Sequence, residues 1–308
     1  MILITEFMDE AAVKSLANTF ETIYDPDLAD RQDDIPSKLA NVEALIVRNR
    51  TKVTKELLST APNLKCVGRL GVGLDNIDQV ACAERGVTVF PAIGANNLSV
   101  AEYVISSAMT LLRGAYTSTN EVLAGGWPRQ ACAGREISGK TLGLIGFGAI
   151  AQHTATLARA LGMDICAYDP FLPSDHNAWE GAQSLDLEAL LVKSDVISLH
   201  TPLTPDTHHL INADRLSHMK TDAILINAAR GGVVDESALS NALRDGKLGG
   251  AAFDVFETEP VTLESGTIFK DVPNLLLTPH IAGVTAESNV RVSSLIAKTV
   301  ANHLAAPE

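Results

Sequence analysis

Short apolar runs alternate with stretches of helical periodicity along the first third of the chain. The apolar runs predict strands at residues 2–7, 22–26, 44–49, 64–70 and 87–91. Apolar residues with helical spacing lie between some of them, as at residues 10–20 and 53–62. Strands that alternate with helices in this way are typical of α/β proteins with a parallel sheet.

The alternation starts again after residue 140, with more hydrophobic strands. We predict them at residues 141–147, 164–170, 195–200, 223–229, 249–256 and 274–280. Nearly continuous apolar strands indicate a parallel sheet that is covered on both faces. Helices are expected at residues 99–113, where Ser99 and Glu102 form a possible capping box, at 117–124 and at 286–304. The pattern therefore predicts two α/β units in series.

Composition and charge limit the classes of function. The 308 residues include 46% hydrophobic and 20% charged residues, as in a globular protein, and the net charge of -13 disfavours a nucleic-acid partner. The cysteines at positions 66, 82, 132 and 166 are far apart and suggest neither a zinc site nor a disulfide framework. No apolar run approaches the roughly 18 residues of a membrane span, and the N-terminus lacks a signal-peptide pattern. We expect a cytoplasmic protein without a membrane or nucleic-acid partner.

A glycine turn supplies the clearest functional motif. Gly146, Gly148 and Ala151 follow a predicted strand and begin a predicted helix in the G-x-G-x-x-A pattern of dinucleotide-binding sites. The glycines allow a tight turn and close approach of a pyrophosphate, which the helix N-terminus favours electrostatically. The next strand ends at Asp169, where an acid can bind the ribose hydroxyls and repel a 2′-phosphate. The sequence therefore predicts NAD rather than NADP.

Three further strands of this second series end in chemically useful side chains. They are followed by Arg230, by the acids Asp254, Glu257 and Glu259, and by His280. Ligands of open parallel sheets gather at the carboxyl ends of strands. Arg230 can hold the carboxylate of a 2-keto acid, His280 can exchange a proton with its carbonyl oxygen, and Glu259 can hold the imidazole. Each residue alone has a structural explanation, such as an internal ion pair, but the combination suits hydride transfer.

Motifs along nearly the whole chain resemble one family. "GFGAIA", "HTPLTPDTHHLI", "NAARGGVVDESAL", "GAAFDVFETEP" and "PHIAG" are similar to the D-isomer-specific 2-hydroxyacid dehydrogenases, nearest to the phosphoglycerate-dehydrogenase-like branch. The resemblance implies a doubly wound Rossmann domain at residues 99–284 for NAD. It also implies a smaller, flavodoxin-like α/β substrate domain made of residues 1–98 and 285–308. It further implies a homodimer through residues 99–113. Because the sequence stops at Glu308, we expect it to lack the C-terminal regulatory domain of some phosphoglycerate dehydrogenases.

The same resemblance assigns site residues. It implies catalytic roles for Arg230, Glu259 and His280. The cofactor contacts that the motifs imply are Gly146, Gly148, Ala149, Ile150, Asp169, Thr201, Ala228, Arg230 and Asp254. The implied substrate contacts are Arg48, Arg50, Val72, Gly73 and Arg230. Arg50 stands where phosphoglycerate dehydrogenases usually carry a small residue, so extra positive charge and a second substrate anion are expected, as in 3-sulfolactate or 3-phosphoglycerate.

Several alternatives remain open at this point. The substrate could instead be glyoxylate or hydroxypyruvate, and Arg50 could belong to a solvated basic loop. A formate dehydrogenase is disfavoured because that branch has glutamine in place of Glu259. A non-catalytic NAD-sensing protein shares the fold and is the alternative from another class. His200, His208 and His209 lack accompanying ligands at metal spacing, so no metal is expected.

Overall fold

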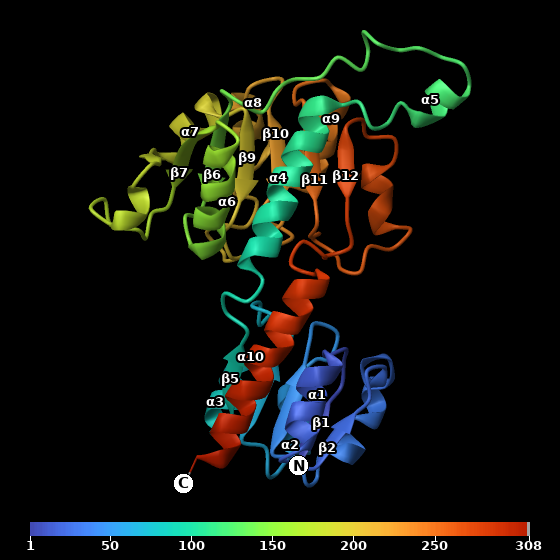
Figure 1. The fold of residues 1–308 in the computed structure, drawn as a ribbon, viewed down its shortest axis with the longest axis vertical. Coiled ribbons are helices and arrows are strands. Elements are labelled where there is room, and N and C mark those ends of the chain that lie inside the picture. Colours follow the sequence, from blue (N-terminus) through green and yellow to red (C-terminus); the bar gives the residue numbers. More distant parts are fainter. Residues whose placement is uncertain (307–308) are drawn as a thin grey trace. The chain divides into compact units, whose positions relative to one another are not determined.

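The computed structural model describes residues 1–306 and divides them into two compact units. One unit contains Met1–Asn96 and the C-terminal residues from Val284, and the other is Asn97–Gly283. Each unit contains one parallel sheet with helices packed on it (Figure 1). The predicted α/β class is confirmed in both.

The first unit has five parallel strands in the order β2-β1-β3-β4-β5. Their bounds are Ile2–Ile4 (β1), Thr22–Tyr24 (β2), Ala44–Val47 (β3), Cys66–Arg69 (β4) and Thr88–Pro91 (β5). This is the flavodoxin-like order, in which the direction of winding reverses between β1 and β3. Ligands of such sheets bind at this switch point, beyond the carboxyl ends of the two strands.

Helices cover both faces of the first sheet. They are Glu10–Ala17 (α1), Lys55–Ser59 (α2), Gln79–Glu84 (α3) and Ala286–Ala305 (α10), with 3-10 turns at Leu28–Asp34 (η1) and Pro36–Lys38 (η2). Successive strand residues point to opposite faces. Ile2 and Ile4 of β1 therefore pack with Ile296 of α10, whereas Leu3 packs with Leu58 and Cys82 on the other face.

The second unit has seven parallel strands in the order β12-β11-β10-β9-β6-β7-β8. Their bounds are Thr141–Ile145 (β6), Asp164–Tyr168 (β7), Gln183–Ser184 (β8), Val196–Leu199 (β9), Ile224–Asn227 (β10), Gly250–Phe253 (β11) and Leu275–Leu277 (β12). Counted from β6, this is the Rossmann order with one additional parallel strand. The switch point lies between β6 and β9, which pair in register from Leu142 with Val196.

Two groups of helices cover the second sheet. The helices are Asn97–Arg113 (α4), Thr119–Leu123 (α5), Ala149–Ala160 (α6), Leu187–Lys193 (α7), Ala213–His218 (α8) and Glu236–Arg244 (α9), with 3-10 turns at Asn177–Trp179 (η3) and Ser265–Phe269 (η4). Helices α4 and α6 contribute to one hydrophobic core and α7, α8 and α9 to another. Figure 1 shows α5 on a long loop away from the sheet.

The structure confirms the predicted strands and corrects two details. Helix α4 begins at Asn97, so Ser99 lies inside its first turn and is not the N-cap. The helix thus begins two residues earlier than predicted. Asn97 and Ser99 are polar but buried, so the polarity of Ser99 was misleading as a sign of an exposed cap. The two-residue strand β8 was not predicted, because its exposed Gln183 and Ser184 give no hydrophobic signal.

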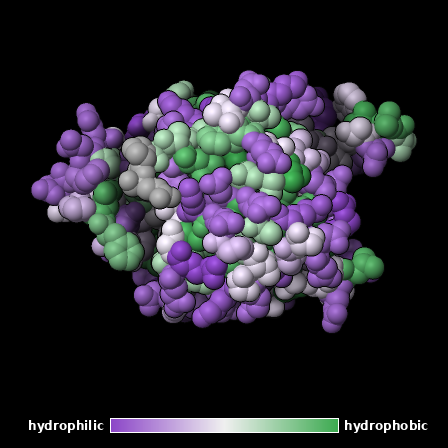
Figure 2. Space-filling view, turned by 90° about the horizontal axis from the view of Figure 1, so that it is seen from below, coloured by the Kyte–Doolittle hydropathy of each residue, from purple (hydrophilic) through white to green (hydrophobic). Residues whose placement is uncertain are grey.

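Hydrophobic and hydrophilic residues are mixed on the surface. On the face shown in Figure 2, hydrophobic residues form small groups between hydrophilic ones. Within residues 1–306, every helix is too short or too polar to cross a membrane.

Candidate active site

The glycine turn after β6 has the geometry that a pyrophosphate requires. Gly146 has a φ of 85°, and a Cβ there would lie 2.7 Å from the carbonyl oxygen of His200. Gly148 is the N-cap of α6, and a Cβ there would have no neighbouring atom within 4 Å. Open space therefore lies beside the N-terminal N–H groups of the helix, where Ala149 and Ile150 are the first two residues. This arrangement fits a bound dinucleotide.

Other predicted cofactor residues lie at neighbouring strand ends. The Asp169 carboxylate accepts hydrogen bonds from the N–H groups of Phe147, at 2.8 Å, and Phe171, at 3.0 Å, so it lies beside the glycine turn. Thr201 follows β9, and its buried hydroxyl has no hydrogen-bond partner among residues 1–306. A buried polar atom of this kind is expected where a ligand completes the bonding. Ala228 follows β10 directly.

Glu259 and His280 form a close pair, as the sequence predicted. Glu259 Oε2 lies 2.7 Å from His280 Nδ1, and Glu259 Oε1 accepts a hydrogen bond of 2.9 Å from the N–H of Phe256. Burial alone would raise the pKa of Glu259. The hydrogen bonds from His280 and Phe256, with the nearby charges of His280 and Arg230, outweigh burial and hold this pKa below its ordinary value. Glu259 is thus ionised and fixes one nitrogen of the imidazole.

Asp254 holds the turn that carries His280. Its buried carboxylate accepts hydrogen bonds from the Thr278 hydroxyl at 2.6 Å and from the N–H groups of Ile281 at 2.8 Å and Ala282 at 2.7 Å. The His280 N–H donates to the Asp254 carbonyl at 2.8 Å, and His280 has a positive φ of 55°. This conformation is uncommon for histidine and persists because Asp254 fixes both sides of the turn.

Asn227 holds the segment that carries Arg230, and sequence reasoning missed it. The buried Asn227 donates from Nδ2 to the Arg230 carbonyl at 2.9 Å and accepts from the Ala229 N–H at 3.1 Å. A Cβ on Gly231 would lie 1.8 Å from the carbonyl oxygen of Phe256. The backbone after Arg230 therefore packs directly on the loop that begins at Phe256 and carries Glu259.

A second group of acids and a histidine lies beside this pair, and its buried member, Glu236, was not singled out from the sequence. Glu236 accepts a hydrogen bond of 2.7 Å from the N–H of Glu257, whose carboxylate lies 3.0 Å from His209 Nε2. Burial of Glu236, with the charges of Glu257 and Glu259, raises its pKa to about 7. The only sequence signal was that an acid begins the helix after a strand, which usually indicates capping alone.

The three histidines that were considered as metal ligands contact other side chains of the protein. His200 Nε2 lies 3.0 Å from the Ser198 hydroxyl, and burial lowers the pKa of His200 to about 4. The rings of His208 and His209 stack with centroids 4.0 Å apart. No group of three or more potential metal ligands occurs within residues 1–306.

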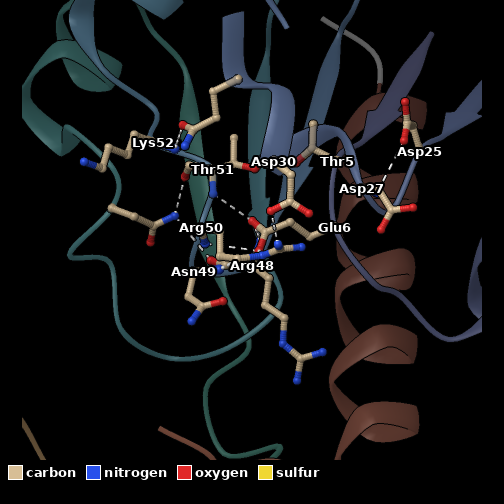
Figure 3. A network of polar contacts seen from close by, with 12 residues as sticks. Thr5, Glu6, Asp25, Asp27, Asp30, Arg48, Asn49, Arg50, Thr51 and Lys52 are labelled. Atoms are coloured by element: carbon tan, nitrogen blue, oxygen red, sulfur yellow. Dashed lines mark hydrogen bonds and ion pairs between the residues drawn. The ribbon is translucent and has the colours of Figure 1, made fainter. Parts of the chain in front are cut away.

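In the first unit, Arg48 and Arg50 follow β3, as predicted. Arg48 donates to Asn289 Oδ1 at 2.7 Å and lies over the Phe7 ring, with its guanidinium carbon 5.9 Å from the ring centroid. Burial lowers the pKa of Arg48, opposed by the charge of Glu6. Figure 3 shows Arg48 together with Glu6, Arg50 and Asp30.

Arg50 does not add the uncompensated positive charge that the sequence led us to expect. Its Nε lies 3.7 Å from Glu6 Oε2, and its Nη1 forms an ion pair with Asp30. Two acids therefore offset its charge within the first unit. Val72 and Gly73 follow β4, and Val72 is exposed.

The comparisons with known proteins establish the family. The model of the "D-isomer specific 2-hydroxyacid dehydrogenase, NAD binding domain" matches residues 105–282. The chain belongs to this family and is an NAD-dependent D-2-hydroxyacid dehydrogenase. It is 54% identical over 293 residues to an (S)-sulfolactate dehydrogenase of Chromohalobacter salexigens, covering 95% of this chain and 94% of that protein.

Two further relatives extend the comparison. A D-3-phosphoglycerate dehydrogenase of Methanocaldococcus jannaschii is 37% identical, and the match covers 97% of this chain but only 56% of that protein. The crystal structure of D-lactate dehydrogenase from Aquifex aeolicus, complexed with NAD and lactic acid, matches with a TM-score of 0.85 and 32% identity. That match covers 99% of this chain and 95% of the other. NAD is accordingly the cofactor.

Proposed function

We propose that the chain interconverts sulfopyruvate and (S)-sulfolactate, with NAD as the electron carrier. The 54% identity to an (S)-sulfolactate dehydrogenase over nearly the full length carries this proposal. The configuration agrees with the family. In sulfolactate the sulfonomethyl group ranks above the carboxylate, whereas in lactate the methyl group ranks below it. The label therefore changes from R to S while the spatial arrangement stays that of a D-2-hydroxy acid.

The chain's own side chains supply binding and proton transfer. Arg230 binds the substrate carboxylate and polarises the ketone. His280 donates a proton to the carbonyl oxygen during reduction and accepts it during oxidation, while Glu259 holds the ring through Nδ1. The bound nicotinamide supplies or accepts the hydride. Since Glu259 Oε2 engages Nδ1, the other ring nitrogen, Nε2, is left to exchange the proton with the substrate.

The cofactor contacts are proposed at the glycine turn and the adjoining strand ends. The N–H groups at Ala149 and Ile150 bind the pyrophosphate, and Asp169 accepts hydrogen bonds from the adenosine ribose. The unpartnered Thr201 hydroxyl supports a cofactor contact at the end of β9. Ala228, Arg230 and Asp254 are proposed near the nicotinamide, although the Asp254 carboxylate already serves the His280 turn.

The second substrate anion is assigned to the first unit. Arg48 and Arg50 are the candidate partners of the sulfonate, and the backbone at Val72 and Gly73 is the candidate partner of the carboxylate. The exposed ion pair between Arg50 and Asp30 is of a kind that contributes little stability, so a sulfonate can replace Asp30.

A kinetic panel tests the substrate. Sulfopyruvate, 3-phosphohydroxypyruvate, hydroxypyruvate, glyoxylate and pyruvate are compared by kcat/KM with NADH. We expect sulfopyruvate to rank first and Arg50→Ala to reduce its lead. Equal values for the substrates with one and two anions would overturn the proposal. A lead for 3-phosphohydroxypyruvate would favour the second candidate, 3-phosphoglycerate, which the similarity to phosphoglycerate dehydrogenases supports.

Assembly and location are also proposals. We propose a cytoplasmic homodimer that associates through the region of residues 99–113, which lies in α4. Helix α4 supports this, because Leu98 and Met109 are exposed on it in the single chain. Sedimentation at micromolar concentration should give twice the mass of the 32.6 kDa chain, and a monomer would contradict the proposal.

A further inference from the structure

Glu6 is a buried acid of the first unit, two residues beyond the end of β1. Its side chain is 2% exposed. The carboxylate accepts backbone hydrogen bonds from four successive residues: Arg48 at 2.8 Å, Asn49 at 3.3 Å, Arg50 at 3.1 Å and Thr51 at 3.0 Å (Figure 3). The loop after β3 is thus wrapped around one side chain, with all four N–H groups turned inward.

Asn76 holds the same loop through its carbonyl groups. Its Nδ2 donates to the carbonyl oxygens of Thr51 at 2.7 Å and Arg48 at 3.3 Å. Asn76 lies in the segment that follows β4, only three residues beyond Gly73. The two candidate anion-binding segments, residues 48–51 and 72–73, are therefore linked by one side chain.

The position of Glu6 indicates that its charge does not serve to attract the substrate. Strands β1 and β3 are neighbours at the switch point of this sheet, where ligands of such folds bind. A carboxylate at this place repels an anionic substrate. Its charge is offset by the four N–H groups and by Arg50, so what it contributes is the shape of the loop.

We propose that Glu6 and Asn76 are positioning residues that set where Arg48 and Arg50 stand relative to the backbone at residues 72–73. This inference rests on the proposed function, because it assigns the loop to the second substrate anion. Neither residue needs to touch the substrate.

Two variants distinguish a positioning role of Glu6 from an electrostatic one. Each removes one negative charge near Arg50. Glu6→Gln places an NH2 donor against two of the four backbone N–H donors and disturbs the loop. Asp30→Asn removes the exposed acid of the ion pair and leaves the loop contacts intact. If charge alone mattered, both variants would favour sulfopyruvate. Positioning predicts opposite effects.

The measurement is the ratio of kcat/KM for sulfopyruvate to kcat/KM for pyruvate. We expect Glu6→Gln to lower the ratio about tenfold or more through KM, since misplacement by about 1 Å can cost about 10²-fold. Asp30→Asn should raise it about two- to fivefold, the range that an exposed ion pair supports. Loss of activity toward both substrates in proportion would show a merely structural role and overturn the inference. A raised ratio in Glu6→Gln would do the same.

Asn76→Ala keeps the proposal testable if Glu6→Gln does not fold. It removes the two hydrogen bonds that Asn76 donates to the same loop without changing the charge, and the ratio should again fall. An unchanged ratio in a folded Asn76→Ala protein contradicts the inference. Failure of the proposed function is distinguishable, because the wild type itself would then show no preference for sulfopyruvate.

Discussion

The two units treat the switch points of their sheets in opposite ways. In the second unit, the turn after β6 carries glycines, and the N-cap of α6, Gly148, has no atom within 4 Å of where its Cβ would lie. In the first unit, the N–H groups after β3 are already bound to Glu6, and arginine side chains follow instead. The anion site proposed for the second unit is therefore made of backbone amides, whereas the one proposed for the first unit is made of guanidinium groups that a buried acid positions. The first arrangement suits a shared cofactor, and the second suits discrimination between substrates.

Loss of the proton-transfer group should have the largest effect, and it should be independent of the substrate. His280→Ala is expected to lower kcat about 10²- to 10⁴-fold for sulfopyruvate and pyruvate alike, with NADH binding retained. Steady-state kinetics and a fluorescence titration of NADH measure the two quantities. His218→Ala is the matched control, because His218 also pairs with a glutamate, Glu188 at 2.9 Å, and both side chains are exposed. Equal effects of the two variants would contradict the assignment.

Loss of the ribose acid should affect the cofactor and leave substrate choice unchanged. Asp169→Ala is expected to raise the Kd of NADH about 10- to 100-fold, because hydrogen bonds to a charged group contribute about 1.5–3 kcal/mol. Binding of NADPH should weaken less, since the acid no longer repels the 2′-phosphate. Asp175→Ala, an exposed acid on the same connection, is the control. An unchanged preference for NADH after Asp169→Ala would show that another group reads the ribose.

Glu236 should make the stability of the protein depend on pH. Burial of Glu236, with the charges of Glu257 and Glu259, raises its pKa to about 7. The folded protein therefore holds a proton that the unfolded chain releases at lower pH. The free energy of unfolding should fall as the pH rises from about 4.5 through 7, by about 1–3 kcal/mol.

Glu236→Gln removes this contribution. In this variant the free energy of unfolding should fall less between pH 5 and pH 8 than in the wild type, as measured by urea unfolding at the two pH values. Glu10→Gln is the matched control, because Glu10 occupies the same position after a capping aspartate but is exposed. If the free energy of unfolding of Glu236→Gln changed with pH as much as that of the wild type, the role of Glu236 would be contradicted.

The sequence predicted the second unit's site more completely than the first unit's. Gly146, Asp169 and His280 belong to patterns in which position after a strand indicates the chemistry. Glu6 and Asn76 could not be found in this way. Their contacts join residues 42 to 45 and 25 to 28 positions apart, and depend on which strands are neighbours in the sheet.

The same limit explains Arg50. Its position at the end of a strand was predicted, but Asp30 lies in the irregular 3-10 segment η1, whose approach to Arg50 no periodicity indicates. Asn227 and Glu236 were missed for a related reason, because side chains that hold backbone loops leave no spacing pattern in the sequence.

The most direct test of the difference between the units is the kinetics of Arg48→Ala with sulfopyruvate and with pyruvate. Arg48 is half-buried and held by Asn289, so its removal deletes the better fixed of the two candidate guanidinium groups. Arg31→Ala, which removes an exposed arginine paired with Asp25, is the control. We predict that kcat/KM falls about 10- to 100-fold for sulfopyruvate and changes less than about threefold for pyruvate, since charge-assisted hydrogen bonds contribute about 1.5–3 kcal/mol. An equal fall for both substrates would contradict a separate site for the second anion.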